Sequence, residues 1–287
     1  MLYIDLFFQG IIQGAIYALI ALGLTLVYGL LRILHVAHAS LFTLGGYVGV
    51  VVTNATGSFI FSMFLSIFVV GFVGMSSYKI IYKPLIDKPP LIALIASIGI
   101  FIASEELFRI IFGAYGLSYN NPPLKNQVDL FSDIMITEAR LLLIFLSGTL
   151  LLIISWLSNN TKLGVSARAT VIDPEMASSC GVDVEKIRYM IFFVGSAFAA
   201  IAGVMVSLLN NLVEPTMGSV PSYKALAIIV LGGLGNVKGA LLASLALGII
   251  ESFGTIYLGN ILDRDSIAFA FLILVLMIKP NGLLSKG

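Results

Sequence analysis

Charged residues are scarce in this chain. Only 11% of its 287 residues are Asp, Glu, Lys or Arg, whereas 59% are hydrophobic. Soluble domains carry roughly 25% charged residues, so this composition excludes a soluble globular protein. The net charge of +1 gives no basis for binding nucleic acid. A single cysteine, Cys180, excludes an intrachain disulfide and argues against a cysteine-based metal site.

The chain also lacks the motifs that carry chemistry. It has neither an HExxH zinc motif nor a hydrolase nucleophile elbow. The run 232–239 (GGLGNVKG) faintly resembles a phosphate-binding loop, but its spacing fails and no Ser or Thr follows the Lys, so we expect a tight turn between closely packed helices. His35 and His38 share a helical face without a third ligand nearby, which favours hydrogen bonds within the bundle over a metal site. We expect no catalytic residue, no metal site and no cofactor bound by this chain.

Long apolar segments are abundant instead, and most have the roughly 17–25 residues that cross a bilayer. The predicted spans cover about residues 7–30, 34–53, 59–78, 91–112, 139–158, 189–210, 222–236, 239–257 and 266–279. Two of them, 34–53 and 222–236, carry glycine pairs, which predicts broken or re-entrant helices and leaves eight or nine crossings. We expect an all-α polytopic membrane protein with a single transmembrane domain over residues 1–287. Its first span is expected to be retained, because no basic n-region precedes it.

Basic residues predict the orientation, since short cytoplasmic loops are enriched in Lys and Arg. With the N-terminus outside and the C-terminus inside, eleven of the 16 fall in inner loops: Arg32, Lys79, Lys83, Lys88, Lys162, Arg168, Lys186, Arg188, Lys238, Lys279 and Lys286. The outer loops hold four: Lys125, Arg140, Lys224 and Arg264. This bias places the polar segment 159–188 in the cytosol.

The segment 159–188 contains a compact helix signal. Asp173 and Pro174 are typical of a helix start, Glu175 suits the first turn, and Gly181 suits the end, so we expect a helix over 174–180. Such a helix is only about 10 Å long at 1.5 Å per residue. Because so short a helix is not stable alone in water, we expect something outside the membrane to hold it, and such a helix is typical of contact with a partner.

Polar groups inside the spans are candidates for a solute path. A charge at the bilayer centre costs about 2.5–3.5 kcal/mol, so Glu105, Glu106 and Arg109 are expected to face the bundle interior or a wet cavity. Glu105 and Arg109 have the i,i+4 spacing of an intrahelical pair. A structural ion pair near the outer end of the span is the alternative for this group. Glu251 is interpreted as a structural polar contact.

Two further regions bear on a solute. Broken helices expose backbone groups toward a cavity, and on this basis the remaining path candidates are His38, Ser40, Gly45, Gly232 and Gly233. The outer loop 113–138 is rich in turn residues. It is either a solvated connector or a docking site for an external partner.

Four stretches together resemble one family. They are 23–33 (GLTLVYGLLRI) followed by Ala37 and His38, 161–188 (TKLGVSARATVIDPEMASSCGVDVEKIR), 212–252, and the tail 279–283 (KPNGL). They are similar to the LivH-type permeases of branched-chain amino acid ABC transporters, with a match from about residue 8 to 284. The residues that match the family's cytoplasmic loop are Gly164, Arg168, Ala169, Asp173, Ala177 and Gly181, and Glu175 lies among them.

The resemblance implies a permease that pairs with a second, LivM-like permease, two cytosolic ABC ATPases that bind ATP and Mg, and an external solute-binding protein. It implies the cytoplasmic membrane of a prokaryote, and a coupling role for 159–188. His35, Ala39 and Ser40 depart from the family's usual Asn, Gly and acidic residue, so the solute stays open between hydrophobic amino acids and urea or short amides. From the residues alone, the second hypothesis is an ion-coupled secondary transporter that uses the Glu105–Arg109 group. A membrane enzyme is not supported, because the sequence supplies no nucleophile–base pair.

Overall fold

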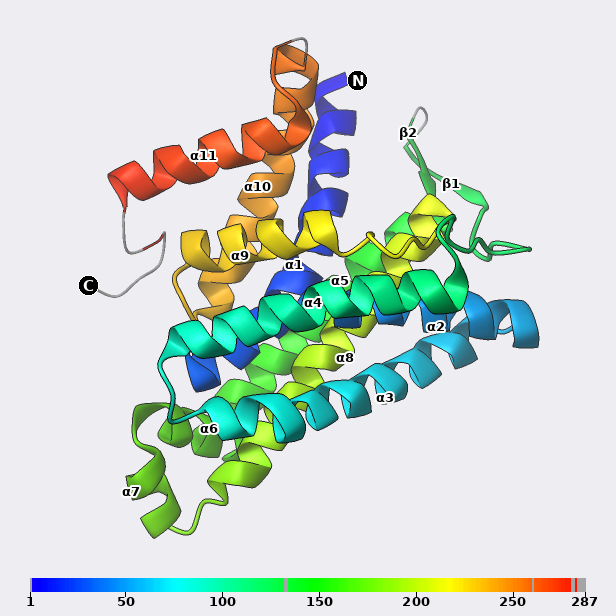
Figure 1. Cartoon of the computed structure of the whole chain (residues 1–287). Helices are drawn as coiled ribbons and strands as arrows, with labels where there is room; N and C mark the ends of the chain where they lie inside the picture. The colour runs from blue at the N-terminus through cyan, green and yellow to red at the C-terminus, as the bar shows by residue number, and fades with distance from the viewer. Residues whose placement is uncertain (1, 132–133, 260, 280–281, 283–287) are drawn as a thin grey trace.

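Helices make up most of the computed structural model, which describes residues 2–131, 134–259, 261–279 and 282 (Figure 1). In chain order the elements are α1 (Leu2–Leu31), α2 (His38–Thr56), α3 (Phe59–Ser77), the π-helix η1 (Tyr78–Tyr82), the 3-10 helix η2 (Lys83–Leu85), α4 (Pro90–Phe112), β1 (Gln127–Phe131), β2 (Ile134–Thr137), α5 (Glu138–Asn160), α6 (Lys162–Ile172), α7 (Pro174–Ser179), α8 (Val184–Asn210), α9 (Ser219–Gly232), α10 (Val237–Leu258) and α11 (Arg264–Ile278). Four residues used in the sequence analysis lie outside the described residues: Pro280, Asn281 and Leu283 of the tail, and Lys286 of the charge count.

Seven helices within the described residues are long and apolar enough to cross a membrane: α1, α2, α3 with its η1–η2 continuation, α4, α5, α8 and α10. This confirms the all-α polytopic class. The helices at the two remaining predicted spans, α9 and α11, are shorter, at 14 and 15 residues. At 1.5 Å per residue they reach only about 21–23 Å, less than the roughly 30 Å of a hydrocarbon core.

α8 is the central helix of the bundle. It packs against α1, α2 and α3, and 78% of its most apolar window is buried. Small residues allow the approach: a Cβ atom on Gly203 would lie only 1.9 Å from the carbonyl oxygen of Phe42 on α2. Without a hydrophobic driving force between helices in lipid, such close backbone packing is a main source of helix association.

α1 and α10 form a second tightly packed pair. A Cβ atom on Gly248 would lie 2.4 Å from the backbone nitrogen of Gly14. The small residues Ala243, Ser244 and Gly248 of α10 are buried, and so are Gly239 and Ala240, which approach Gly232 of α9. The prediction of close helix packing after the glycine run is therefore confirmed.

The two segments predicted as broken helices differ from that expectation. α2 is continuous, and the chain leaves helical geometry before it, between Arg32 and Ala37. Gly45 does not interrupt α2, because its bare Cα faces Ala200 of α8, to which a Cβ atom would approach within 2.6 Å. α9 is also unbroken and ends at the predicted tight turn, where Gly233 has a φ of 96° and the Asn236 side chain accepts from the backbone nitrogen of Gly239.

The outer loop contains an antiparallel hairpin, β1–β2, that the sequence did not predict. The residues that precede it are tied to the bundle. Asn54 donates from its side-chain nitrogen to the carbonyl of Ser118 and accepts from the backbone nitrogen of Asn120, each at 2.9 Å. Tyr119 is buried, with its hydroxyl 3.1 Å from Ser207 Oγ on α8. Residues 118–120 of this loop are therefore anchored to the bundle.

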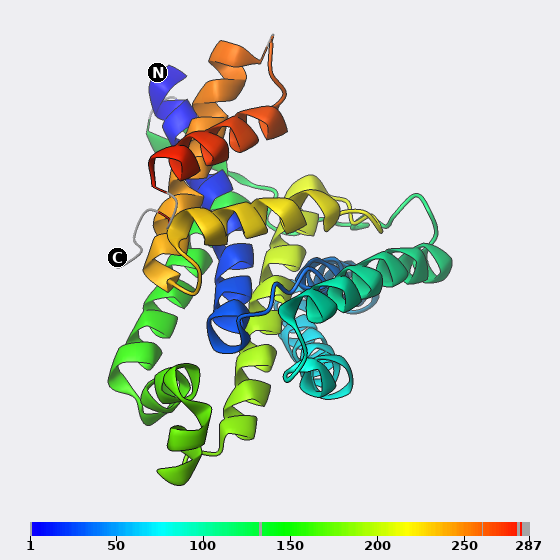
Figure 2. The same cartoon turned by 60° about the vertical axis from the view of Figure 1, so that its left-hand side comes forward.

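The hairpin and the pair α6–α7 lie at opposite ends of the molecule (Figures 1 and 2). The N-terminal end of α1 lies at the same end as the hairpin. The two segments thus lie at opposite ends, as the basic residues predicted, and which end faces the cytosol stays a prediction.

Candidate functional site

The predicted cytosolic helix is present as α7. The Asp173 carboxylate accepts from the backbone nitrogen of Met176 at 2.9 Å, as expected of an N-cap. Gly181 follows the helix with a φ of 85°, and the backbone nitrogen of Val182 donates to the carbonyl of Ala177 at 3.0 Å. The local sequence thus fixes both ends of this helix.

A second helix, α6, precedes α7 and was missed by the sequence analysis. Its N-cap, Thr161, accepts from the backbone nitrogen of Gly164 at 3.2 Å. α7 packs against α6 and α8, and Ala177 is buried there. α6 and α8 therefore support α7 within the chain, and its contact with an outside partner stays a prediction.

The candidate coupling residues divide into two groups. Gly164 and Arg168 shape the junction with α5: a Cβ atom on Gly164 would meet the carbonyl of Ser158, and Arg168 donates to the same carbonyl. Asp173 and Glu175 are exposed at the start of α7, Gly181 is exposed at its end, and Ala169 is half-buried. The apolar side chains of Ile172 and Met176, 82% and 63% exposed, lie at the junction of α6 and α7.

The candidate path residues do not form one site. His38 and Ser40 lie in the first turn of α2, and Gly232 and Gly233 lie at the α9–α10 turn. The charged group is near the C-terminal end of α4, where its pairing differs from the prediction. Arg109 bonds to Glu106 at 3.1 Å and not to Glu105, which accepts from the Ser219 hydroxyl of α9 at 2.5 Å. The Arg109–Glu106 ion pair is exposed.

His35 and His38 are buried between α1, α2 and η1. His35 Nδ1 is 2.6 Å from the Tyr82 hydroxyl, and Tyr82 donates to Ser97 Oγ at 3.1 Å. Ser97 Oγ also accepts from the backbone nitrogen of Ala37 at 2.9 Å. The predicted hydrogen bonding within the bundle is confirmed for His35, and it joins the α1–α2 connection to α4.

A cavity of about 330 Å³ lies beside this chain of hydrogen bonds, between α2, α3 and α4. His35, Ser40 and Tyr82 line it together with aliphatic and aromatic side chains. This volume is at the lower end of the roughly 300–1,000 Å³ of small-molecule pockets. Of the predicted path residues, only Ser40 lines this cavity.

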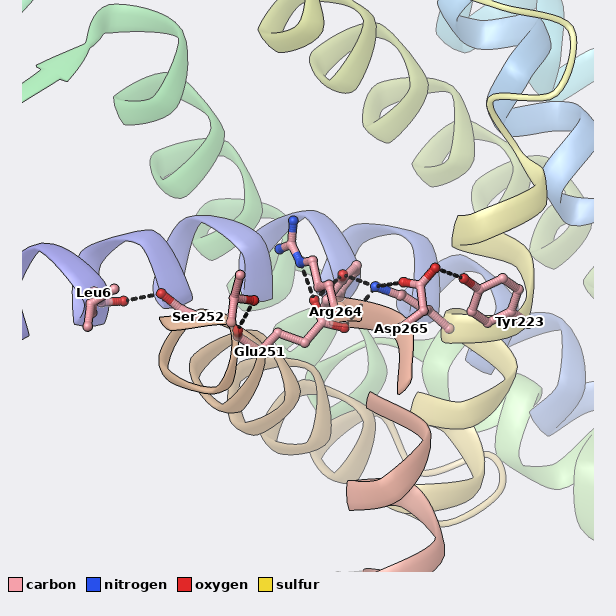
Figure 3. Close-up of polar contacts among 9 residues, drawn as sticks. Leu6, Tyr223, Glu251, Ser252, Arg264 and Asp265 are labelled. Carbon is pink, nitrogen blue, oxygen red and sulfur yellow. Dashed lines mark hydrogen bonds and ion pairs between the residues drawn. The ribbon is translucent and has the colours of Figure 1, made fainter. Parts of the chain in front are cut away.

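A buried ionic network joins α1, α9, α10 and α11 (Figure 3). The fully buried Glu251 carboxylate accepts from Lys224 at 2.8 Å, Tyr17 at 2.6 Å and Arg264 at 2.8 Å. Lys224 also pairs with Asp265 at 2.9 Å.

The structural interpretation of Glu251 is confirmed, but the assignment of Lys224 to an outer loop was wrong, since it lies buried in α9. The signal that could have revealed the network is a lone Lys and a lone Glu in two neighbouring apolar segments, because opposite charges inside a membrane protein pair.

These features define a multi-pass membrane transport component, with a helical pair at one end and a cavity among its spans. The model of the family described as the branched-chain amino acid transport system permease component matches residues 6–278. The chain belongs to this family.

Curated relatives match almost the whole chain. The high-affinity branched-chain amino acid transport system permease protein LivH of Salmonella typhimurium is 29% identical over 297 residues, covering 99% of this chain and 96% of the relative. The corresponding permease protein BraD of Pseudomonas aeruginosa is 28% identical, with the same two coverages. A probable LivH of Methanocaldococcus jannaschii is 29% identical over 97% of this chain and 93% of the relative.

Proposed function

We propose that this chain is a permease subunit of an ATP-driven importer for branched-chain or other hydrophobic amino acids. The observation that carries this proposal is the family match over residues 6–278, together with relatives that the chain matches over almost their whole length and whose names specify high-affinity transport of these amino acids. The chain supplies the route through the membrane and no catalytic group.

The complete importer would contain a second permease, two cytosolic ATPases and an external solute-binding protein. ATP and Mg would bind to the ATPases. The bias of basic residues supports an N-terminus outside and a C-terminus inside the cytoplasmic membrane of a prokaryote. The hairpin end would then face the binding protein, and the α6–α7 end would face an ATPase.

The geometry supports a direct mechanical link. α6 and α7 lie between α5 and α8 in the chain, and α8 is the central helix of the bundle. The Arg168 bond to Ser158 holds α6 against the end of α5. A force applied by an ATPase to Ile172 and Met176 would therefore reach both flanking spans, and it would switch the permease pair between outward-open and inward-open states.

The test is uptake by the complete complex in proteoliposomes, assembled from this chain and the products of its neighbouring reading frames. We expect uptake of leucine, isoleucine or valine that requires internal ATP and the binding protein and is insensitive to uncouplers. Uptake of urea or acetamide alone would overturn the solute class. Uptake driven by an ion gradient without ATP would overturn the importer assignment.

A further inference from the structure

A groove of about 580 Å³ separates α5 from the turn between α9 and α10. One wall is α5 with the adjoining Arg168 of α6, and the other runs from Leu234 to Leu241 at the start of α10. We call it the α5–α10 groove. It shares no lining residue with the cavity between α2, α3 and α4. Its volume lies within the roughly 300–1,000 Å³ of sites that hold small molecules.

The charged residues among the described lining of the groove are both basic. They are Arg168 on one wall and Lys238 on the other, and both residues are exposed, so an occupant can reach them. Neither forms an ion pair with a described residue, and the Arg168 guanidinium bonds only to Ser158 among these residues. Two cations at one groove without a counter-ion attract an anion, and Arg and Lys are the side chains that bind phosphate.

The start of α10 adds positive charge of a second kind. The first N–H groups of a helix have no partner within it, and they place about half a positive charge at its N-terminus. Asn236 caps this 22-residue helix by accepting from the backbone nitrogen of Gly239. The backbone N–H groups of Val237 and Lys238, which line the groove, therefore have no partner within the helix. An anion in the groove would meet these donors as well.

The rest of the groove is apolar and extends into the membrane. Along α5 the lining runs from Asn159, near the end of the helix, to Leu151, which is about 12 Å deeper at 1.5 Å per residue. Leu26 of α1 and Leu241 of α10 add apolar surface. Because α5 is long and apolar enough to span a membrane, the Leu151 end lies toward the hydrocarbon and the Asn159 end toward the membrane surface. A ligand that fills the groove therefore needs an anionic head and an apolar tail.

We propose that the α5–α10 groove binds a phospholipid with an anionic headgroup, such as phosphatidylglycerol, from the membrane leaflet at the α6–α7 end. The phosphate lies between Arg168, Lys238 and the start of α10, and an acyl chain lies along the apolar wall of α5. Basic pockets between membrane helices bind anionic lipid headgroups in this way. An acidic side chain of a soluble partner would meet the same cations but would leave the apolar depth unfilled. The lipid site is independent of the solute that the chain carries.

The only tryptophan of the chain, Trp156, provides a probe of the site. It lies on α5 next to Ser155, which lines the groove. The purified full chain would be reconstituted in vesicles of equal parts phosphatidylcholine and phosphatidylglycerol, with brominated acyl chains on one lipid at a time, because bromine quenches tryptophan fluorescence at short range. We expect stronger quenching by brominated phosphatidylglycerol. Equal quenching by the two brominated lipids would overturn the proposal.

Substitutions of single lysines test the headgroup contact. Lys238→Gln should lower the preference for phosphatidylglycerol about fivefold, the effect of one basic residue near an anionic membrane surface. Lys238→Arg should keep the preference, because the charge is retained. Lys88 is exposed, is predicted to lie on the same side of the membrane and does not line the groove, so Lys88→Gln is the matched control and should also keep it. Equal losses in Lys88→Gln and Lys238→Gln would indicate general surface attraction and overturn the site.

Two further measurements separate the lipid from other anions. Inorganic phosphate should not weaken the quenching by brominated phosphatidylglycerol, relative to sodium chloride of the same ionic strength. If phosphate does weaken it, the groove is a site for a soluble anion and the lipid assignment is wrong. In the complete complex, a loss of ATP-dependent uptake in Lys238→Gln without any change in lipid preference would assign the cation to an ATPase contact and would likewise overturn the proposal.

Discussion

The buried network around Glu251 gives the sharpest test of what stabilises this fold. Lys224→Met removes the cation that contacts both Glu251 and Asp265. Breaking a buried ion pair by removing one partner costs about 3–5 kcal/mol, because the other charge stays buried. Glu251 keeps Tyr17 and the half-exposed Arg264 as partners, so we expect a loss near the lower end, about 3 kcal/mol.

Two further variants separate the buried charge from the rest of the network. Asp265 is 44% exposed, so Asp265→Asn should cost only about 0–1 kcal/mol, as for a surface pair. The double variant Lys224→Met/Glu251→Gln removes both opposite charges and keeps a hydrogen-bond acceptor for Tyr17. It should therefore be less destabilised than the sum of its single variants by about 2 kcal/mol.

The assay is the free energy of unfolding from SDS titration in mixed micelles, measured on the parent chain and all four variants, with Glu251→Gln as the fourth. Reconstituted uptake would show in parallel whether the network matters beyond stability. The reasoning fails if Lys224→Met costs less than about 1 kcal/mol, or if the single costs add to within about 0.5 kcal/mol in the double variant.

Three further predictions follow from other parts of the structure. Met176→Asp should leave folding intact and abolish ATP-dependent uptake, whereas Met176→Leu should keep uptake because the exposed apolar contact is retained; normal uptake by Met176→Asp would remove this side chain from the ATPase contact. Gly203→Ala should destabilise the chain by at least about 1–3 kcal/mol through overpacking against Phe42. The Cβ atom of Gly99→Ala would meet nothing within 4 Å, so this variant should be stabilised by up to about 1 kcal/mol. Equal effects of the two substitutions in SDS titration would contradict the packing argument. Burial raises the pKa of Tyr119 to about 12. Above its unfolded pKa of about 10, the parent chain should lose stability relative to Tyr119→Phe, because the phenol of the unfolded chain ionises first. Parallel pH profiles of the unfolding free energy for the two chains would refute this.

Local signals in the sequence predicted local structure well. The ends of α7 follow from Asp173, Pro174 and Gly181, because an N-cap, a proline at the first position and a left-handed glycine act within one helical turn. The tight turn after Gly232 is of the same kind. α6 was missed because its polar residues carry no hydrophobic periodicity, and its position depends on contacts with α1, α5 and α8.

Features that depend on contacts between residues far apart in the sequence could not be predicted equally well. Gly45 was interpreted as a helix break because glycine is flexible, but in a membrane bundle it provides close contact, here with Ala200. The candidate path residues were chosen as polar or glycine positions one at a time, and only the tertiary structure shows that Ser40 shares a cavity with His35 while Gly232 does not. The burial of Lys224 likewise depends on Glu251 and Asp265, which lie on other helices.

α9 joins the buried network around Glu251 to α4, which forms one wall of the cavity. Lys224 ties it to the α1–α10 pair through Glu251, and Ser219 ties its first turn to Glu105 of α4. α4 forms one wall of the cavity and is otherwise loosely packed, with only 17% of its most apolar window buried. The Glu105–Ser219 hydrogen bond is thus a direct contact between α9, which carries Lys224 of the network, and the α4 wall of the cavity.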